Sequence, residues 1–478
     1  MTLDEALDRI HASPDGPQVA AFFDFDGTIV HGFSGIHFFR DRLFAGKVGP
    51  GELLGTLLNG ARGTDSEADF ERFVAVAFRA WGGHTEAEMS TVGQHLFENT
   101  LAGLIYPEAW QLIRAHDAKG HTLVIASSAS KFQFEAAAHA LGVEHLLYTP
   151  LEVRDGVLTG KVDGKSLWRS GKARATREFA EEHGIDTAAS FTYSNGGEDV
   201  EFLSVVGNPT ATNPDKSLAE DAGARDWPIL RFRPRGTHSV KDVARTAAAF
   251  GTMVGAAGAG VGLGLLNRNR KVALDTITSM SGEMALATAG VDIRVIGEDH
   301  AWSQRPAVFI FNHQSQLDIL VLAKLLREGI TGVAKQEIAT DPILGVPLRL
   351  AGATFVDRKN STKAKEALGP VVDTLRAGTS VIIAPEGTRS LTPSINPFKK
   401  GAFHMAMQAG VPIVPVVLRN TGELMWKHST LVRSGTVDVL VHEPIDVSGW
   451  HADNLDEHIA EIEAFYRDTI ANWPKGGH

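Results

Sequence analysis

The chain has 478 residues, of which 43% are hydrophobic and 22% charged, so it is long enough for two or three globular domains and does not have the composition of a disordered protein. Its formal net charge of −11 excludes the broad basic surface that nucleic-acid binding requires. The absence of cysteine excludes disulfides and thiolate chemistry, and we expect no secretory signal because the first residues lack a basic region followed by an apolar one.

Residues 1–225 are predicted to form an α/β domain with a doubly wound parallel sheet. Two continuous apolar runs, 19–23 and 122–126, are typical of buried strands, which deliver side chains to the carboxyl edge of such a sheet. The helical periodicity between these runs predicts a cap over about 31–110. The polar residues that follow the predicted strands or open the next helix are Asp24, Asp26, Ser127 (with Ser128 as the alternative), Lys172, Asn195 and Asp199.

These polar residues have the chemistry of a phosphate-transfer site. A carboxylate can attack phosphorus when a cation neutralises the two charges, and a second carboxylate two residues on can protonate the leaving oxygen and later activate water. Asp24 and Asp26 form such a pair. A hydroxyl group and an ammonium group suit a phosphate, and a further acid suits a divalent cation.

The ordered set resembles the haloacid dehalogenase superfamily, in its phosphoserine phosphatase-like branch, over roughly residues 15–220. The resemblance implies a Rossmann-like domain with Asp24 as nucleophile, Asp26 as general acid and base, and Ser127 and Lys172 as phosphate ligands. The residues that it assigns to Mg²⁺ are Asp24, Asp26 through its carbonyl oxygen, Asn195 and Asp199. Asn195 departs from the pattern, because that branch has an acidic residue there and an amide supplies no charge. The alternative is therefore a first domain that binds a phosphorylated ligand without hydrolysing it.

Residues 226–285 are predicted to link two domains, and they contain the uncharged, glycine-rich and alanine-rich segment 246–267. This segment is long enough to cross a bilayer core of about 30 Å, but its six glycines lower its helix propensity. The pairs Gly251/Gly255 and Gly260/Gly264 have the spacing of close helix contacts. A transmembrane span, a re-entrant hairpin and a buried helix all fit the pattern. We favour a helix or hairpin in the membrane interface, with the catalytic domains in the cytoplasm.

Residues 286–478 are predicted to form a second α/β domain. One strand, at 307–311, delivers Asn312-His313, and another, at 381–384, delivers Pro385-Glu386-Gly387-Thr388-Arg389. His313 is suited to take a proton near neutral pH, and Asp318 can accept a hydrogen bond from the other ring nitrogen. The guanidinium groups of Arg358 and Arg389 suit a phosphate group.

These motifs and the later run Val411-Pro412-Ile413-Val414-Pro415 resemble, in order, those of the glycerolipid acyltransferases, closest to the 1-acylglycerol-3-phosphate acyltransferases, across roughly residues 290–450. The resemblance implies that an acyl group passes from acyl-CoA or acyl-carrier protein to lysophosphatidic acid, giving phosphatidic acid, with His313 as general base and Asp318 as its partner. The residues implied to bind the acceptor are Arg358, Glu386, Gly387, Thr388 and Arg389.

The sequence therefore predicts a bifunctional, membrane-associated enzyme of phospholipid biosynthesis. A non-enzymatic, membrane-tethered scaffold would require His313 to be dispensable, which the complete series of motifs disfavours. The acyl-chain length, the phosphatase substrate and the oligomeric state have no signature in the sequence.

Overall fold

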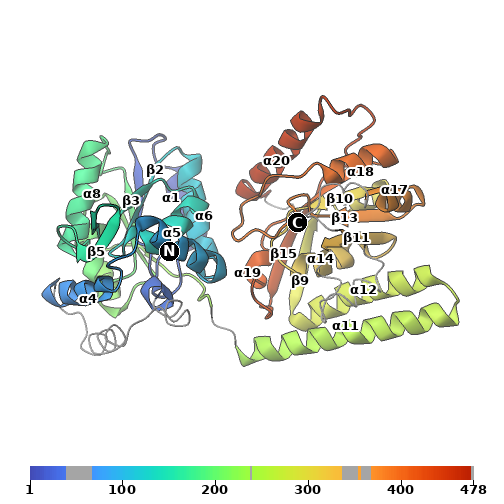
Figure 1. Ribbon diagram of the computed structural model, residues 1–478, viewed down its shortest axis with the longest axis horizontal. Helices are drawn as coiled ribbons and strands as arrows, with labels where there is room; N and C mark the ends of the chain where they lie inside the picture. The colour runs from blue at the N-terminus through green and yellow to red at the C-terminus, as the bar shows by residue number, and fades with distance from the viewer. Residues whose placement is uncertain (39–66, 237–238, 336–353, 357–367, 475–478) are drawn as a thin grey trace. The chain divides into compact units, whose positions relative to one another are not determined.

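The computed structural model describes residues 1–38, 67–236, 239–335, 354–356 and 368–474, and it divides into two compact units, Met1–Thr237 and His238–His478 (Figure 1). The unit boundary differs from the predicted linker over 226–285. Residues 226–236 complete the first unit by adding the short strand β8 (Ile229–Leu230) to its sheet, and most of the remainder is helix packed within the second unit. The apolar side of these helices needs a partner, which the second unit supplies.

The first unit is built on a six-stranded parallel sheet in the order β3-β2-β1-β6-β7-β8. Its other strands are β1 (Ala20–Phe23), β2 (Thr122–Ala126), β3 (His145–Leu147), β6 (Phe191–Ser194) and β7 (Asn208–Thr212). The central strand β1 is buried along its whole length, as its apolar run predicts.

Helices cover both faces of this sheet. On one face, α8 (Ser170–Glu182) and α9 (Val200–Leu203) pack Phe179 and Phe202 against the strands. On the other, α6 (Pro107–Ala118) packs beside α1 (Leu3–His11). The fold class predicted for this domain, a doubly wound α/β fold, is confirmed. Of the predicted cap, the structure describes α4 (Glu67–Arg79) and α5 (Glu86–Asn99), and residues 39–66 lie outside the described residues.

The second unit has a seven-stranded sheet in the order β12-β11-β13-β10-β14-β15-β9, in which only the β14–β15 pair is antiparallel among the described strands. The strands are β9 (Val291–Ile296), β10 (Val308–Phe311), β11 (Ile330–Lys335), β12 (Thr354–Val356), β13 (Ser380–Ile383), β14 (Ile413–Leu418) and β15 (Gly435–Val441). The helices beside it include α14 (Leu317–Leu326), α17 (Leu368–Arg376), α18 (Gly401–Ala409) and α20 (Leu455–Ala471). Separate apolar clusters form its two faces, so the predicted second α/β domain is also confirmed.

Two long helices precede this sheet and lie side by side as a hairpin (Figure 1). They are α11 (Val240–Leu266), which begins at a capping box formed by Ser239 and Asp242, and α12 (Arg270–Ala289). An added Cβ at Gly264 would lie 2.5 Å from the Ala273 Cβ, and one at Gly260 would lie 2.8 Å from the Ala273 carbonyl oxygen. The predicted close helix contact therefore exists at Gly260/Gly264. Within the part of the chain that the structure describes, no such contact forms at the other glycine pair, since an added Cβ at either Gly251 or Gly255 would have no neighbour within 4 Å there.

The length and composition of α11 match those of a membrane span, and α11 is the one helix of the described ranges for which this holds. Only 22% of its apolar window is buried. Such exposure differs from the buried-helix interpretation of the segment 246–267, because a core helix would be covered on most sides.

Candidate active sites

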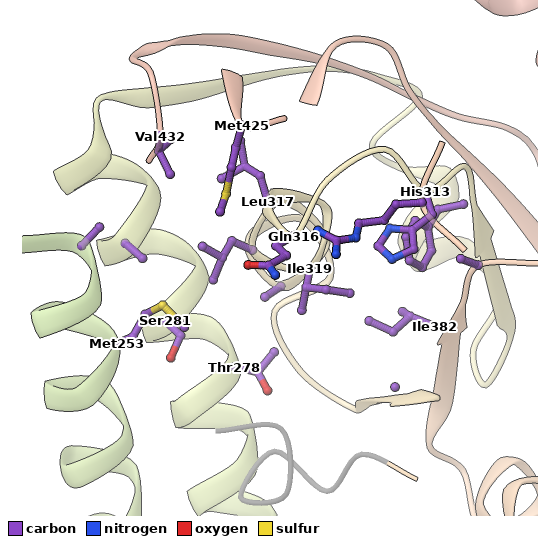
Figure 2. Close-up of a pocket in the computed structure, with 18 of the residues that line it drawn as sticks. Met253, Thr278, Ser281, His313, Gln316, Leu317, Ile319, Ile382, Met425 and Val432 are labelled. Atoms are coloured by element: carbon purple, nitrogen blue, oxygen red, sulfur yellow. The ribbon is translucent and has the colours of Figure 1, made fainter. Parts of the chain in front are cut away.

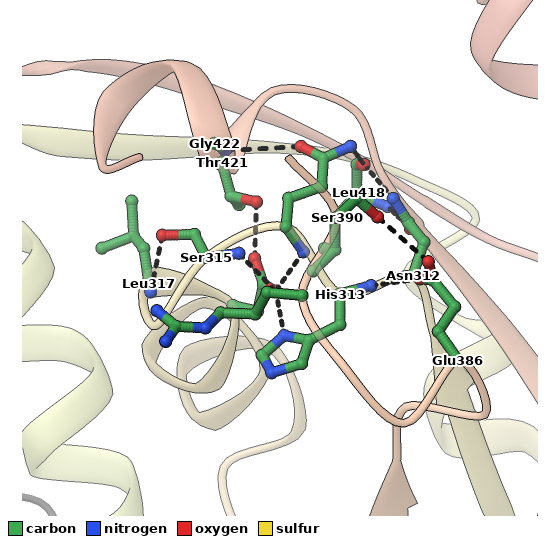
Figure 3. Close-up of polar contacts among 12 residues, drawn as sticks. Asn312, His313, Ser315, Leu317, Glu386, Ser390, Leu418, Thr421 and Gly422 are labelled. Atoms are coloured by element: carbon green, nitrogen blue, oxygen red, sulfur yellow. Dashed lines mark hydrogen bonds and ion pairs between the residues drawn. The ribbon is translucent and has the colours of Figure 1, made fainter. Parts of the chain in front are cut away.

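The loop between β10 and α14 holds His313 beside a buried acid. His313 Nδ1 lies 2.7 Å from Asp318 Oδ2, and the same oxygen accepts hydrogen bonds from the backbone N–H groups of Gln314 (2.9 Å) and Ser315 (3.0 Å) (Figure 3). Asp318 has no exposed surface, whereas the His313 side chain is 22% exposed. Because the carboxylate accepts from Nδ1, the proton resides there and the Nε2 lone pair is free to accept another.

Glu386 supports this loop from the end of β13. Its Oε1 accepts a hydrogen bond from the His313 backbone N–H at 2.7 Å, and its Oε2 accepts from Ser390 Oγ (3.0 Å) and from the Asn396 backbone N–H (2.9 Å). Burial raises the pKa of Glu386, and these donors oppose that effect. Both carboxylate oxygens of Glu386 thus accept hydrogen bonds from the protein, and Oε1 holds the backbone of His313. The predicted contact of Glu386 with the acceptor stays a prediction.

His313 opens onto a cavity of about 430 Å³. Apolar side chains of α11, α12, α14, β11 and β13 line most of it, among them Met253, Ile277 and Leu320. Figure 2 shows His313 across the cavity from Met253 and Ser281. The polar lining near His313 includes Gly387, Thr388, Arg389 and Lys427. An apolar chamber with one polar, cationic region suits a ligand that has an acyl chain and an anionic group.

Arg389 is half buried in this polar region. Its Nη1 donates to the Lys427 carbonyl oxygen at 2.7 Å, and burial lowers the pKa of its guanidinium group. Gly387 has φ +75°, a left-handed conformation that permits the tight turn before Arg389. The other predicted arginine, Arg358, lies outside the described residues.

The predicted residues of the first unit meet at the carboxyl edge of its sheet. Lys172 Nζ donates to Asp24 Oδ1 (2.7 Å) and to Asp199 Oδ2 (2.6 Å), and all three side chains are buried. Burial raises the pKa of Asp24 to about 7, although Lys172 opposes the shift. Burial alone would lower the pKa of Lys172, but the two carboxylates raise it. The edge of the sheet therefore holds two acids around one ammonium group.

The remaining predicted residues surround this trio. Asp26 accepts hydrogen bonds from the backbone N–H (2.7 Å) and the hydroxyl group (3.0 Å) of Ser34, and burial raises its pKa to about 6. The Asn195 amide lies against the turn at Gly27, where a Cβ atom would collide with it. Ser127 is buried at the end of β2, and its Oγ accepts from the Ala129 backbone N–H at 3.2 Å. In the described ranges, no group of three or more histidine or acidic side chains gathers around a common point.

The sequence did not indicate three residues that contribute to the two sites. Ser34 binds Asp26, Lys427 joins Arg389 in lining the cavity, and Thr421 donates to Asp318. Each is common in type and lies outside the recognised motifs, so no local pattern distinguishes it. Only the fold brings these residues to their partners.

Comparison with known proteins gives a match for each unit. The family model for acyltransferases matches residues 292–419, and the model for haloacid dehalogenase-like hydrolases matches residues 21–204. The 1-acyl-sn-glycerol-3-phosphate acyltransferase of Saccharomyces cerevisiae is 34% identical over 184 residues, which are 38% of this chain and 60% of that protein. An uncharacterised acyltransferase of Schizosaccharomyces pombe is 32% identical over 190 residues, which are 39% of this chain and 68% of that protein. A crystal structure of phosphoserine phosphatase is 16% identical, with a TM-score of 0.33, and the match covers 45% of this chain and 94% of that one.

The second unit thus has the domain of the acyltransferases, and the first matches the model for haloacid dehalogenase-like hydrolases. The chain belongs to the acyltransferase family and joins this hydrolase domain to it. Both predicted resemblances are confirmed. The chain spans 60% of the length of the Saccharomyces enzyme.

Proposed function

We propose that the second unit transfers an acyl group from acyl-CoA or acyl-carrier protein to the free hydroxyl of lysophosphatidic acid, giving phosphatidic acid. The observation that carries this proposal is the 2.7 Å contact between His313 Nδ1 and the buried Asp318, at the edge of an apolar cavity that Arg389 also lines. A relative with the same activity in its name, the Saccharomyces enzyme, supports the choice of substrate.

The chemistry follows from the free Nε2 of His313. This nitrogen takes the proton of the acceptor hydroxyl as the oxygen bonds to the thioester carbon, and Asp318 stabilises the resulting imidazolium. The C–S bond then breaks, and the departing thiolate takes the proton back from Nε2. No covalent acyl-enzyme is needed, because the acceptor hydroxyl is itself the nucleophile.

Recognition of the two substrates divides between the ends of the cavity. Arg389 offers a planar fork of donors to the phosphate of the acceptor, with Thr388 and the backbone around Gly387 nearby. Arg358 belongs to the same proposed phosphate site, on the basis of its motif alone. The apolar lining from α11 and α12 is suited to an acyl chain.

For the first unit we propose phosphomonoester hydrolysis, with Asp24 as nucleophile and Asp26 as general acid and base. Lys172 and Ser127 would bind the phosphate. The residues that would hold Mg²⁺ are Asp24, Asp26 through its carbonyl oxygen, Asn195 and Asp199, whose donor atoms are all oxygens, as this cation prefers. When bound, the cation supplies positive charge that offsets the charge of the phosphate. A phosphate-ligand sensor is the alternative that Asn195 supports.

We further propose that α11 docks on a membrane, which places the cavity near its lipid substrates. Val254, Val261 and Leu265 are exposed and recur at helical spacing, whereas Ala256 and Gly260 on the opposite side are buried. Leu265→Glu should reduce sedimentation of the full-length protein with phosphatidylcholine–phosphatidylglycerol vesicles. Unchanged sedimentation would exclude this face as the docking surface.

Two assays on the full-length protein test the catalytic proposals. For acyl transfer, His313→Ala should lower phosphatidic acid formation from acyl-CoA and lysophosphatidic acid by roughly 10²–10⁴-fold, whereas the exposed control His451→Ala should not. For hydrolysis, Asp24→Asn should abolish Mg²⁺-dependent phosphate release from a panel of phosphomonoesters and lysophospholipids, with the exposed Asp117→Asn as control. Equal release by wild type and Asp24→Asn would favour the sensor.

A further inference from the structure

The last residue of β14 and the segment that follows it hold the loop that carries His313. The amide of Asn312 donates to the Leu418 carbonyl oxygen and accepts from the Leu418 backbone N–H, both at 2.7 Å. Ser315 Oγ donates to the Met425 carbonyl oxygen at 2.6 Å. Residues 418–425, which we call the clamp segment, therefore hold the His313 loop across a sequence separation of more than 100 residues.

Within the clamp segment, the side chain of Thr421 reaches the catalytic pair formed by His313 and Asp318. Its hydroxyl group donates to Asp318 Oδ1 at 2.5 Å, and both residues have no exposed surface (Figure 3). The other oxygen, Oδ2, receives the three donors described above from His313, Gln314 and Ser315. Among the described residues, the donor that binds Asp318 Oδ1 is the hydroxyl group of Thr421.

The structure assigns to Thr421 the role of positioning residue for the general base, an inference that rests on the proposed acyl transfer. A carboxylate bound at both oxygens cannot rotate about its Cβ–Cγ bond without breaking a charge-assisted hydrogen bond. The contact with Thr421 therefore keeps Oδ2 directed at His313 Nδ1, and this direction fixes the tautomer that leaves Nε2 basic. Without the hydroxyl group, Oδ1 would be a buried acceptor with no partner.

The hydroxyl group of Thr421 does not cap the helix to which this residue belongs. Thr421 opens the short helix α19 (Thr421–Leu424), whose N-cap is Asn420, and no side chain caps that helix. The backbone carbonyl oxygen of Thr421 accepts from the Met425 N–H, so the helical turn forms without the hydroxyl group. The side chain is thus used for Asp318 rather than for its own helix.

The test uses the full-length protein with acyl-CoA and lysophosphatidic acid. Thr421→Val keeps the shape of the side chain and removes the hydroxyl group, and we expect kcat to fall by roughly 10–100-fold while KM for each substrate stays within about 2-fold. Thr421→Ser retains the hydroxyl group and should restore kcat. Unchanged kcat in Thr421→Val, or a change confined to KM, would overturn the assignment.

A double-mutant cycle separates positioning from general damage. If Thr421 acts through Asp318, then Thr421→Val should cause no further loss in an Asp318→Ala background, whereas equal loss in both backgrounds would overturn the assignment. Should Thr421→Val fail to fold, Thr421→Cys against Thr421→Ser makes the same comparison, with only the serine variant expected to retain kcat. Absence of acyl transfer in the wild-type protein would instead refute the proposed function, so the two failures are distinguishable.

Discussion

Replacement of Glu386 by glutamine tests whether this acid supports His313 or contacts the substrate. The carboxylate accepts three hydrogen bonds, from the His313 and Asn396 backbone N–H groups and from the Ser390 hydroxyl group, and it is 2% exposed. Glutamine has only one accepting oxygen. If that oxygen faces His313, its NH₂ group meets the Asn396 N–H, and the reverse orientation places two donors together at His313.

One buried N–H group therefore loses its partner in either orientation, at a cost of about 1–3 kcal/mol. Glutamine carries no charge, so it avoids the unfavourable burial of a charged carboxylate that raises the pKa of Glu386, and this gain offsets part of the cost. For a unit of this size each 1 kcal/mol lowers the melting temperature by about 2–4 °C. We expect a lower melting temperature and a lower kcat, because the His313 backbone loses its anchor, with little change in KM.

The assay combines thermal unfolding of the full-length protein, followed by circular dichroism, with steady-state acyl transfer. The exposed Glu443→Gln is the matched control, and Ser390→Ala, which removes one of the three hydrogen bonds, should have an intermediate effect. A Glu386→Gln variant with wild-type melting temperature and kcat but a raised KM for lysophosphatidic acid would refute the reasoning. That result would mean that the carboxylate binds the acceptor.

Three further predictions concern other parts of the chain. Gly264→Ala should destabilise the second unit by about 1–3 kcal/mol, because the added Cβ meets Ala273. Gly262→Ala, on the open side of the same helix, should stabilise the unit by about 0.5–1 kcal/mol. Equal shifts of the melting temperature in the two variants would contradict the close helix contact. Arg389→Lys should raise KM for lysophosphatidic acid about 10-fold, since an ammonium group cannot form the two parallel hydrogen bonds of a guanidinium group. An unchanged KM in steady-state kinetics would show that Arg389 does not bind the phosphate group. Burial lowers the pKa of His116 well below its usual value. The unfolded chain therefore binds more protons than the folded one once the pH falls below about 6.5. Below that pH, the free energy of unfolding of the first unit should fall through this group by up to about 1.4 kcal/mol per pH unit. Asp24 and Asp26, with raised pKa values, act in the opposite direction, so the measurement is the difference in thermal unfolding between wild type and His116→Gln from pH 7.5 to 5.5, and identical pH slopes would contradict the prediction.

The sequence by itself determined the two α/β domains and the positions of their main motifs. Buried parallel strands consist of continuous apolar runs, so the strands that precede Asp24 and His313 were predictable from a few consecutive residues. The pair formed by His313 and Asp318 was also predictable, because both residues belong to one loop and the helix that follows it.

The tertiary structure alone decided how these sites are supported. The parallel pairing of β10 with β13 brings Glu386 to the backbone N–H of His313, a contact that the sequence did not indicate. Thr421 reaches Asp318 only because β14 pairs with the other edge of β10. The hairpin of α11 and α12 belongs to the second unit and forms a wall of its cavity. The side of the hairpin that faces the cavity is stabilised by packing against distant strands and helices, which a short stretch of sequence does not show. Local motifs specify which groups are available for chemistry, whereas long-range strand pairing and packing determine which of these groups meet.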